Sequence, residues 1–405
     1  MNQKLVAFVE ALQIGLDLPC QARPVERIKL EEGLGRIVSE DIMALEDLPK
    51  ATHSAMDGFA FALEDLGACV GVACVVYAGM NVSNLEVPKG ACAKIMTGAL
   101  LPQGLDLVVP FEEMLEFDDK HAQAPKHKPN QQAFKKGDNV RFQGEDLQKG
   151  AILVKKGTRL HVGLLALLAS QGMAVIPVFK RLKVGVISSG DEIVPLGTKA
   201  LPHQIYDSNA LALVALLKDH GYEACHLGKL GDDLEAQKHA IEGFLDYDVV
   251  LSSAGVSVGD KDYFKEALAQ MGAKIHYHGV NVKPGKPIML ASLQKQGRST
   301  LVFGLPGNPL SCLLTFLALG LGVLEKQAGS LAIPLSVQAR LSEPLKLKGD
   351  RAHLILGHLD QGIFTPYRNN RYSSGALDAL GACQAIALVQ GNTETIEVFF
   401  YKRFL

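Results

Sequence analysis

The sequence predicts a multidomain protein of the α/β plus β class. Its 405 residues exceed one ordinary domain, since domains usually contain about 100–200 residues. Between residues 179 and 327, apolar strands alternate with helical segments, which indicates a doubly wound, mostly parallel sheet with helices on both faces. On either side, residues 46–140 and those after Ile333 contain short β-like runs separated by turn residues.

The first 178 residues are expected to begin with helix and continue with strands. Apolar residues from Leu5 to Ile14 have near-helical spacing, and residues 1 to about 45 are expected to be helical, with Glu31 to Ile42 forming a second helix or a turn. We further predict strands at 71–77, 91–96, 106–110 and 174–178, a helix at 162–170, and an exposed hairpin or loop at 117–133.

The α/β region has the most regular pattern. Its predicted strands are 184–188, 224–227, 248–252, 274–280 and 300–303, and its predicted helices are 209–220, 234–245, 263–271 and 310–324. Shorter alternating runs follow at 335–340, 353–358, 362–367, 385–389 and 395–401. These last runs predict a small all-β domain at the C-terminus.

Composition excludes several classes of protein. The net charge of -2 gives no global attraction to nucleic acid or to an acidic membrane surface. We expect no transmembrane helix, because the longest apolar run, 310–324, is too short, and no signal peptide. The seven cysteines are scattered and include no C-x-x-C pair, which argues against a disulfide framework or a cysteine zinc site. We therefore expect a cytoplasmic protein.

Three predicted strands of the α/β region end in loops rich in Gly, Ser, Asp and Pro. These loops are 188–192, with the sequence S-S-G-D-E, 252–260, with S-S-A-G-V-S-V-G-D, and 304–309, with G-L-P-G-N-P. Ligands of open α/β sheets bind beyond the carboxyl ends of the strands, and glycines let backbone N–H groups approach a phosphate. Each loop alone reads as an ordinary turn, but three together favour a phosphate-bearing ligand. None of the three loops matches the Walker loop or the G-x-G-x-x-G motif, which argues against an ATPase and against a dinucleotide-binding protein.

A basic loop and several carboxylates accompany these strand ends. In the loop K-P-G-K-P, Lys283 and Lys286 are held close together by two prolines and a glycine, which suits a diphosphate or an oxyanion. The alternative is a solvated basic turn. The carboxylates are Asp191, Glu192, Asp207, Asp232, Asp233, Asp260 and Asp262. Beside a phosphate such carboxylates usually need a cation, most often Mg²⁺, although singly each is better read as a helix cap or a surface charge.

The β-rich region carries three further motifs at breaks in the secondary structure. Asp57 stands in S-A-M-D-G-F-A, Thr97 in M-T-G-A, and Asp146 in G-E-D. Taken alone, each of the three is a turn residue.

The ordered set of motifs resembles the MoeA family of molybdopterin molybdenumtransferases, which includes the E domain of gephyrin. Besides the motifs above, the set includes D-S-N at 207–209, G-V-S-V-G-D-x-D-Y at 255–263 and G-L-P-G-N-P-x-S at 304–311. The resemblance implies four regions. They are an elongated discontinuous domain (1–45 and 141–178), a β-rich domain (46–140), an α/β molybdopterin-binding domain (179–327) and a C-terminal β-barrel (328–405).

The resemblance also implies an activity. Molybdate and adenylylated molybdopterin would react to give molybdopterin-bound molybdenum and AMP, with Mg²⁺ as the cation. It implies a homodimer in which the β-rich domain contributes to the partner's active site. The molybdopterin adenylyltransferase and recipient apo-molybdoenzymes are the expected partners, and no nucleic acid or membrane is expected.

Residue roles are carried over by position in the motifs. The catalytic candidates are Asp57, Thr97, Asp146, Glu192, Asp232, Asp262, Lys283 and Lys286, and Asp232 and Asp262 are also the expected metal ligands. The candidates for binding the pterin substrate are Ser188, Gly190, Asp191, Asp207, Ser208, Asn209, Gly255, Val256, Ser257, Gly259, Asp260, Pro284, Gly285, Pro306, Gly307, Asn308, Pro309 and Ser311.

The chain departs from the family pattern at a few positions, and two other functions compete. His53 replaces a frequent Asn, Ser189 a frequent Thr and Ala254 a frequent Gly, while Gly279 stands where relatives often carry a basic residue. One alternative is the molybdopterin adenylyltransferase, whose fold resembles the α/β region alone. The other is a non-enzymatic scaffold in the manner of gephyrin. The sequence does not distinguish molybdate from tungstate.

Overall fold

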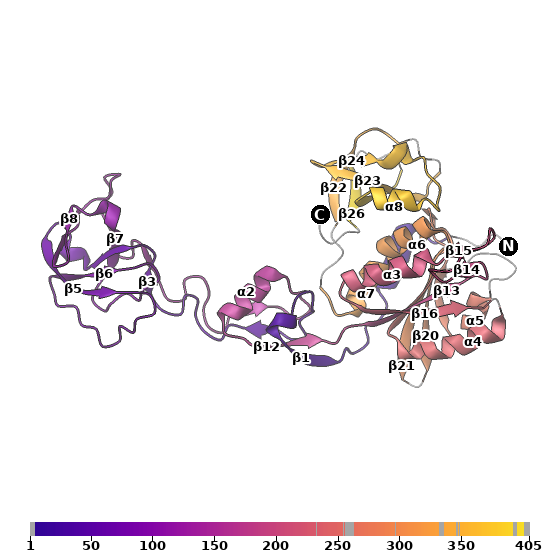
Figure 1. The fold of residues 1–405 in the computed structure, drawn as a ribbon, viewed down its shortest axis with the longest axis horizontal. Helices are drawn as coiled ribbons and strands as arrows, with labels where there is room; N and C mark the ends of the chain where they lie inside the picture. The colour runs from indigo at the N-terminus through magenta and orange to yellow at the C-terminus, as the bar shows by residue number, and fades with distance from the viewer. Residues whose placement is uncertain are drawn as a thin grey trace. The chain divides into compact units, whose positions relative to one another are not determined.

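The computed structural model divides the chain into two compact units. It describes residues 5–231, 233–253, 255, 263–295, 297–331, 336–345, 347, 349–391 and 395–400. Unit 1 comprises Met1–Glu40, Lys156–Ala166 and Ala174–Leu405, and unit 2 comprises Asp41–Lys155 and Leu167–Met173. The chain therefore leaves unit 1 twice, after Glu40 and after Ala166, and returns to it each time. The colours of Figure 1 follow this path along the chain.

A six-stranded sheet forms the centre of unit 1. Its strands lie in the order β16 (Glu223–Leu230), β13 (Lys183–Ser189), β17 (Val249–Ser252), β21 (Arg298–Gly304), β20 (Met289–Lys295) and β18 (Lys274–His278). The first four are parallel, and β20 and β18 are antiparallel to their neighbours. All five predicted strands are confirmed. Strand β20, which pairs antiparallel with β21, was not predicted from the sequence.

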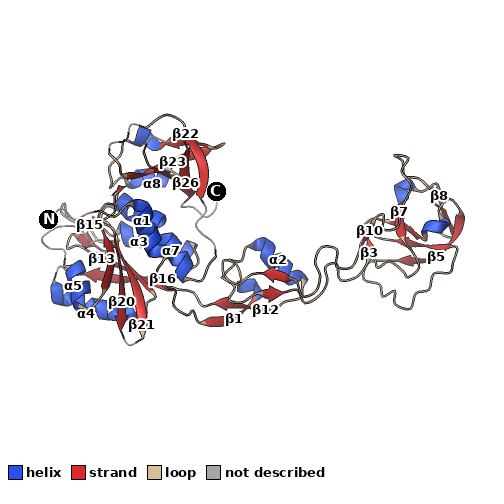
Figure 2. Ribbon diagram, turned by 180° about the vertical axis from the view of Figure 1, so that it is seen from behind, coloured by secondary structure: helices blue, strands red, loops and turns tan. Residues whose placement is uncertain are grey.

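Helices cover both faces of this sheet, as predicted (Figure 2). They are α1 (Phe8–Leu16), α3 (Ser208–Asp219), α6 (Pro309–Thr315) and α7 (Leu321–Gln327) on one face, and α4 (Leu234–Glu242) and α5 (Phe264–Gln270) on the other. The strand sequences explain the two faces. Val249 and Leu251 join the core of the first face, whereas Val250 between them joins the core of the second, because successive side chains of a strand point to opposite sides.

The longest apolar helical run lies in this core. A π-helical turn, Phe316–Gly320, joins α6 to α7, so the run extends over Pro309–Gln327. At 19 residues it is longer than predicted, and within the described residues it alone is long and apolar enough to cross a membrane. Its most apolar window is 78% buried inside the protein, as in a core helix.

The expectation of helix up to about residue 45 was wrong beyond α1. Strand β1 (Val25–Lys29) pairs antiparallel with β12 (Val175–Phe179), and a single 3-10 turn, Leu30–Glu32, follows it. The sequence V-E-R-I-K has polar residues that also suit a helix, and its pairing partner lies about 150 positions away. Only this long-range contact makes the segment a strand.

The C-terminal strands close into a barrel, as the family resemblance implied. The closed order is β23 (Ala352–Asp360), β24 (Ile363–Pro366), β22 (Ser336–Leu341), β26 (Thr395–Phe400), β25 (Ala385–Val389) and back to β23. The short strand β19 (Val282–Lys283) pairs with β23, and helix α8 (Leu377–Ala382) packs nearby (Figure 1). The barrel is therefore hydrogen-bonded to the strand that leads into K-P-G-K-P.

Unit 2 is built on a curled six-stranded sheet. Its order is β7 (Leu107–Pro110), β4 (Gly58–Phe61), β6 (Ala91–Ile95), β5 (Cys69–Val76), β9 (His121–Gln123) and β8 (Glu116–Phe117). The predicted strands 71–77, 91–96 and 106–110 are confirmed, and β8 and β9 form a hairpin at the start of the segment 117–133, which was expected to be a hairpin or a loop. Two ribbons complete the fold, β2 (Ile42–Met43) with β11 (Ile152–Val154) and β3 (His53–Ser54) with β10 (Val140–Arg141). The predicted helix at 162–170 is α2 (Val162–Ser170), whose residues up to Ala166 belong to unit 1 and whose remaining residues belong to unit 2.

Candidate active site

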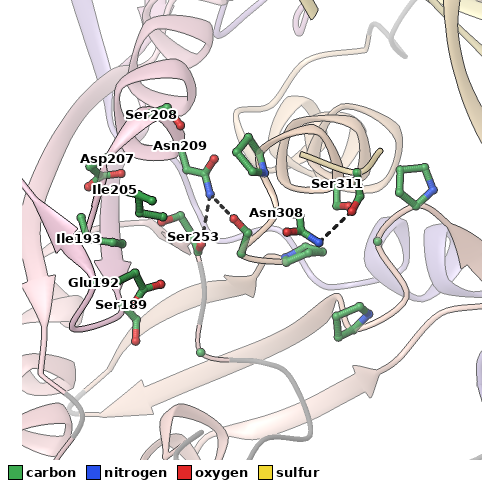
Figure 3. A pocket seen from close by; sticks show the side chains of 18 of the residues that line it. Ser189, Glu192, Ile193, Ile205, Asp207, Ser208, Asn209, Ser253, Asn308 and Ser311 are labelled. Carbon is green, nitrogen blue, oxygen red and sulfur yellow. Dashed lines mark hydrogen bonds between the residues drawn. The ribbon is translucent and has the colours of Figure 1, made fainter. Parts of the chain in front are cut away.

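A cavity of about 670 Å³ opens beyond the carboxyl ends of β13, β17 and β21 in unit 1 (Figure 3). It adjoins the first turn of α3 and the K-P-G-K-P loop. The predicted site residues that line it are Glu192, Lys283, Lys286, Asp207, Ser208, Asn209, Gly255, Pro284, Gly285, Pro306, Gly307, Asn308, Pro309 and Ser311. The structure thus brings together residues that the sequence separates by more than 100 positions, and we call this space the polar cavity.

The N-terminus of α3 connects the loops around the polar cavity. Asp207 caps the helix by accepting a hydrogen bond from the Ala210 amide at 3.0 Å. Its second carboxylate oxygen accepts a hydrogen bond from the Ser188 hydroxyl. The Asn209 side-chain amide donates to the Gly307 carbonyl at 2.8 Å and to the Ser253 carbonyl at 3.5 Å (Figure 3). Asn209 therefore fixes the loops after β17 and β21 against α3.

The K-P-G-K-P loop packs tightly against α6. Gly285 has φ = +100°, and a Cβ atom at this position would lie 2.0 Å from Thr315 Cγ2. Only glycine suits both the backbone angle and the contact. Lys283 ends β19, opposite His353 of the barrel strand β23. The loop thereby brings two lysine side chains to one wall of the cavity, where they provide positive charge for an anionic ligand.

Seven residues line the polar cavity without having been named among the candidates. They are Ser189, Ile193, Ile205, Tyr206, Ser253, Pro287 and Ser374. Ser189, Ser253 and Pro287 stand inside the motifs that were singled out, so their position was available from the sequence. Ile193, Ile205 and Tyr206 belong to a short parallel pair, β14 (Ile193–Val194) and β15 (Ile205–Tyr206), which leaves no periodic signal. Ser374 comes from the C-terminal region and accepts a 2.9 Å hydrogen bond from Asn308.

Other predicted residues lie beside the polar cavity or outside the described part of the chain. Ser188 is fully buried beneath it, and Gly190 and Asp191 precede Glu192 without lining it. The remaining candidates of the α/β region, which are Asp232, Val256, Ser257, Gly259, Asp260 and Asp262, fall outside the described residues. The described residues contain no group of three or more His, Cys, Asp or Glu side chains that would hold a metal ion.

The three motifs of unit 2 form a second cluster, on the surface of that unit. Asp57 accepts hydrogen bonds from both the backbone amide and the hydroxyl of Thr97, at 2.6 and 2.8 Å. Ser54 exchanges backbone hydrogen bonds with the M-T-G-A turn, since its amide donates to Ala99 and its carbonyl accepts from Gly98, each at 2.9 Å. The two motifs are therefore fixed side by side. The two bonds from Thr97, first the amide and then the hydroxyl, lower the pKa of Asp57 below its ordinary value.

The third motif of unit 2, G-E-D at 144–146, closely follows strand β10, which pairs with β3. Arg141 of β10 lies opposite His53 of β3, and its guanidinium donates to Asp146 at 2.5 Å and also to Glu145. The Glu145 carboxylate accepts a bond from the Phe142 amide, which lowers the pKa of Glu145. We refer to Asp57, Thr97, Arg141 and Asp146 as the unit 2 cluster. Glu145 and Arg141 were not among the predicted site residues.

Two long regions of the chain match described protein families. Residues 6–172 match the family described as "MoeA N-terminal region (domain I and II)", and residues 185–326 match the "Probable molybdopterin binding domain". The polar cavity lies mostly in the second of these regions, whose described ligand is molybdopterin. The chain thus has the architecture of proteins that act on this pterin.

Relatives of known sequence and structure narrow the class to a family. The chain is 37% identical to the molybdopterin molybdenumtransferase of Haemophilus influenzae, over 75% of this chain and 73% of that protein. It is 33% identical to the enzyme of that name from Nostoc, over 90% and 84%. Two crystal structures of the MoeA protein from Pyrococcus horikoshii superpose with TM-scores of 0.78 and 0.81, at 31% and 26% identity, over 99% and 98% of this chain and 100% of each of theirs. The chain belongs to the molybdopterin molybdenumtransferase family, which confirms the resemblance and the fold class predicted from the sequence.

Proposed function

We propose that this protein transfers molybdenum from molybdate to adenylylated molybdopterin and releases AMP, as a step of molybdenum cofactor biosynthesis. The observation that carries the proposal is the polar cavity, which Lys283 and Lys286 line together with Ser and Asn side chains near the strand ends. Ammonium groups and neutral donors of this kind bind phosphates and oxyanions. The family that the chain belongs to carries out this transfer by name.

The residues of the polar cavity have distinct proposed tasks. Lys283 and Lys286 bind the phosphate groups or molybdate and offset the negative charge that grows as the phosphoanhydride to AMP breaks. Asn209, which is already fixed to Gly307, holds the loops at the distance that the ligand requires. Glu192 is the carboxylate of the polar cavity that takes part in no helix cap, and we assign it to orienting the reacting groups. The backbone amides at the start of α3 favour an anion at this edge.

We also propose that turnover requires Mg²⁺, held by Asp232 and Asp262. When bound, such a cation would supply charge neutralisation between phosphate oxygens. Asp207 and Asp233 cap α3 and α4 by accepting from Ala210 and Ala236. For these two aspartates, the helix cap that the sequence offered as the alternative role is the one observed.

We propose that the working form is a homodimer in which the unit 2 cluster of one copy completes the polar cavity of the other. Asp57, Thr97 and Asp146 are exposed and held by hydrogen bonds within their own unit. An exposed, pre-ordered carboxylate is suited to act on a ligand bound elsewhere. The four-region division given above, with its boundaries, belongs to the same proposal.

The cellular setting follows from the proposed reaction. The adenylylated substrate comes from a molybdopterin adenylyltransferase, and the product passes to apo-molybdoenzymes, so these are the proposed partners in the cytoplasm. Neither a nucleic acid nor a membrane is a proposed partner. No observation favours the two alternative functions, adenylyl transfer or non-enzymatic scaffolding.

The test is AMP release from adenylylated molybdopterin with Mg²⁺, measured with and without molybdate. We expect release that depends on molybdate and is lost in Asp57→Ala and Asp262→Ala. Lys295→Ala is the matched control, because Lys295 is exposed in the β20–β21 hairpin and does not line the polar cavity. Absence of release under conditions where the pterin binds would refute the proposal.

A further inference from the structure

The segment that precedes α1 is hydrogen-bonded to the base of the K-P-G-K-P loop. The Val6 amide donates to the Gly279 carbonyl at 3.1 Å, and the Val6 carbonyl accepts from the Asn281 amide at 2.8 Å. The two bonds make a parallel bridge between Val6 and Val280. The partner residues lie between β18 and β19, directly before the loop.

The base of the loop is also bonded to the loop itself and to the barrel. The Val280 amide donates to the Lys286 carbonyl at 2.9 Å, which closes the loop. The Ala352 amide of β23 donates to the Asn281 carbonyl at 3.1 Å. Asn281 is thus bonded through its amide to Val6 and through its carbonyl to the barrel. The base of the loop is therefore held between two parts of the chain that lie far from it in the sequence.

Helix α1 anchors the segment in the core of unit 1. Phe8 and Ala11 are buried in the core of the first face of the sheet. Gly15 lies so close to α7 that a Cβ atom there would be 2.6 Å from Val323 Cγ2. Since α1 begins at Phe8, the main chain at Val6 is tied to a closely packed core and cannot easily follow a loop that moves.

The positions of Lys283 and Lys286 depend on the backbone of their loop. Both side chains are exposed, and within the described part of the chain no hydrogen bond or ion pair holds either ammonium group. Two like charges on one short loop repel each other, which favours an open loop when no anion is bound. The backbone must supply the restraint, and the two bonds of Val6 are part of it.

We propose that Val6 is a positioning residue of the polar cavity, whose main-chain bonds hold the K-P-G-K-P loop so that Lys283 and Lys286 reach one anionic ligand together. This inference rests on the proposed function, which assigns the two lysines to phosphate groups or molybdate. Val6 does not line the polar cavity and acts only through the loop. Its contribution comes from the main chain, so every residue type except proline could supply both bonds.

The test compares Val6→Pro with the conservative variant Val6→Ala, by titration calorimetry with AMP on the full chain. Proline removes the amide that donates to Gly279, whereas alanine keeps both bonds. Val6→Pro should weaken AMP binding about three- to tenfold, the effect of losing one hydrogen bond, and Val6→Ala should restore nearly all of the affinity. Hydrogen exchange at the Val280 amide, which closes the loop, should become faster in Val6→Pro alone.

Two further readouts separate a positioning role from a general loss of stability. Sodium chloride screens the attraction between the lysines and the phosphate, so the AMP affinity of the unaltered protein should fall as the salt concentration rises. This fall should be shallower in Val6→Pro, because its lysines no longer meet the phosphate together. A partly unfolded protein would keep the original salt dependence. Exchange at the amide of Val250, which is buried in β17 at the centre of the sheet, should not change.

The outcomes separate this inference from the proposed function. Equal AMP affinity in Val6→Pro and Val6→Ala, an unchanged salt dependence, or equally faster exchange at Val250 and Val280 would overturn the positioning role. Each of these results can occur while AMP release still depends on molybdate, in which case the proposed function stands. Weaker AMP binding with faster exchange at Val280 alone supports the inference. The same result together with no AMP release by the unaltered protein supports the inference and refutes the transferase activity.

Discussion

The polar cavity of unit 1 and the unit 2 cluster contain similar types of charged residue, but these residues are held in place differently. In the polar cavity, charged side chains stand on loops whose shape comes from proline, glycine and backbone hydrogen bonds, as with Gly285 against Thr315. In the unit 2 cluster, each charged side chain is already occupied by a neighbour, as with Asp57 by Thr97 and Asp146 by Arg141. The first region has the shape of a binding site, and the second presents prepared groups on an exposed surface.

This difference indicates a division of work. The polar cavity can hold a large anionic ligand, and the unit 2 cluster can orient a small reacting group but has only its exposed surface to hold it. Under the dimer proposal the two regions come from different copies, so each supplies what the other lacks. Variants of the two regions can therefore separate binding from chemistry, and buried charge from exposed charge.

The largest expected effect concerns buried charge in unit 1. Arg159 contacts both oxygens of Glu325, at 2.8 and 2.6 Å, and the Tyr222 hydroxyl donates to the same carboxylate at 2.7 Å. Burial, followed by the neighbouring Glu325, raises the pKa of Tyr222, so this phenol stays protonated as a donor. Glu325→Gln leaves Arg159 without its anion and should lower the free energy of unfolding of unit 1 by about 3–5 kcal/mol.

The matched change in unit 2 is Asp146→Ala, which breaks an exposed pair with Arg141. Water and salt screen exposed pairs, so the stability of unit 2 should hardly change. Urea unfolding followed by hydrogen exchange in each unit measures both effects. Equal decreases in the free energy of unfolding of the two units would show that burial does not make the Arg159–Glu325 pair more important for stability than the Arg141–Asp146 pair.

The second prediction separates binding from chemistry. Lys283→Ala should weaken both AMP binding and turnover, since it removes a cation from the polar cavity. Asp57→Ala should lower kcat about 10²–10³-fold, the usual cost of losing a group that orients or stabilises the transition state, while AMP binds as before. Calorimetry and initial rates give the two quantities. Weaker AMP binding in Asp57→Ala would place Asp57 in the binding site instead.

The third prediction concerns the shape of the polar cavity. Gly285→Ala places a methyl group 2.0 Å from Thr315 Cγ2 at a φ of +100°. The loop must move, which should weaken AMP binding about tenfold or more. Adding Thr315→Ser removes the clashing methyl group and keeps the hydroxyl that donates to Ser311, so it should restore part of the affinity. If the double variant binds no better than Gly285→Ala, the contact with Thr315 is not the cause.

The smallest expected effect is a change in the pKa of Asp57. Thr97→Ala removes the hydroxyl bond and keeps the backbone bond, which is the larger cause of the shift. The pKa of Asp57 should therefore rise part of the way to its ordinary value of 3.8. Because the folded pKa is depressed, the stability from these bonds is present above pH 3.8 and is lost as the pH falls through the folded value. Carboxyl NMR titration measures the change, and an unaltered pKa would mean that the hydroxyl bond is absent in solution.

The sequence predicted the α/β sheet well because its signals are local. Strands such as 184–188 and 300–303 are apolar runs that end in glycine-rich loops, and the loops themselves identified most of the polar cavity. Segments whose structure depends on distant partners were missed. Strand β1 needs β12, and Tyr206 reaches the polar cavity only through the two-residue pairing of β14 with β15.

The unit 2 cluster shows the same limit. Asp57 and Thr97 are 40 positions apart, and each was identified because it stands in a motif of the family. The contact between them depends on the pairing of Ser54 with the M-T-G-A turn, which no local pattern encodes.

The most direct test of the central claim is activity in a purified heterodimer of Asp57→Ala and Lys283→Ala, made by co-expression with two different affinity tags. Each homodimer carries a defect in both of its sites and should be inactive. If each site combines unit 1 of one copy with unit 2 of the other, the heterodimer has one site with both defects and one intact site. It should then release AMP in the presence of molybdate at about half the rate of the unaltered dimer. Activity that stays at the level of the two homodimers would contradict a site shared between copies.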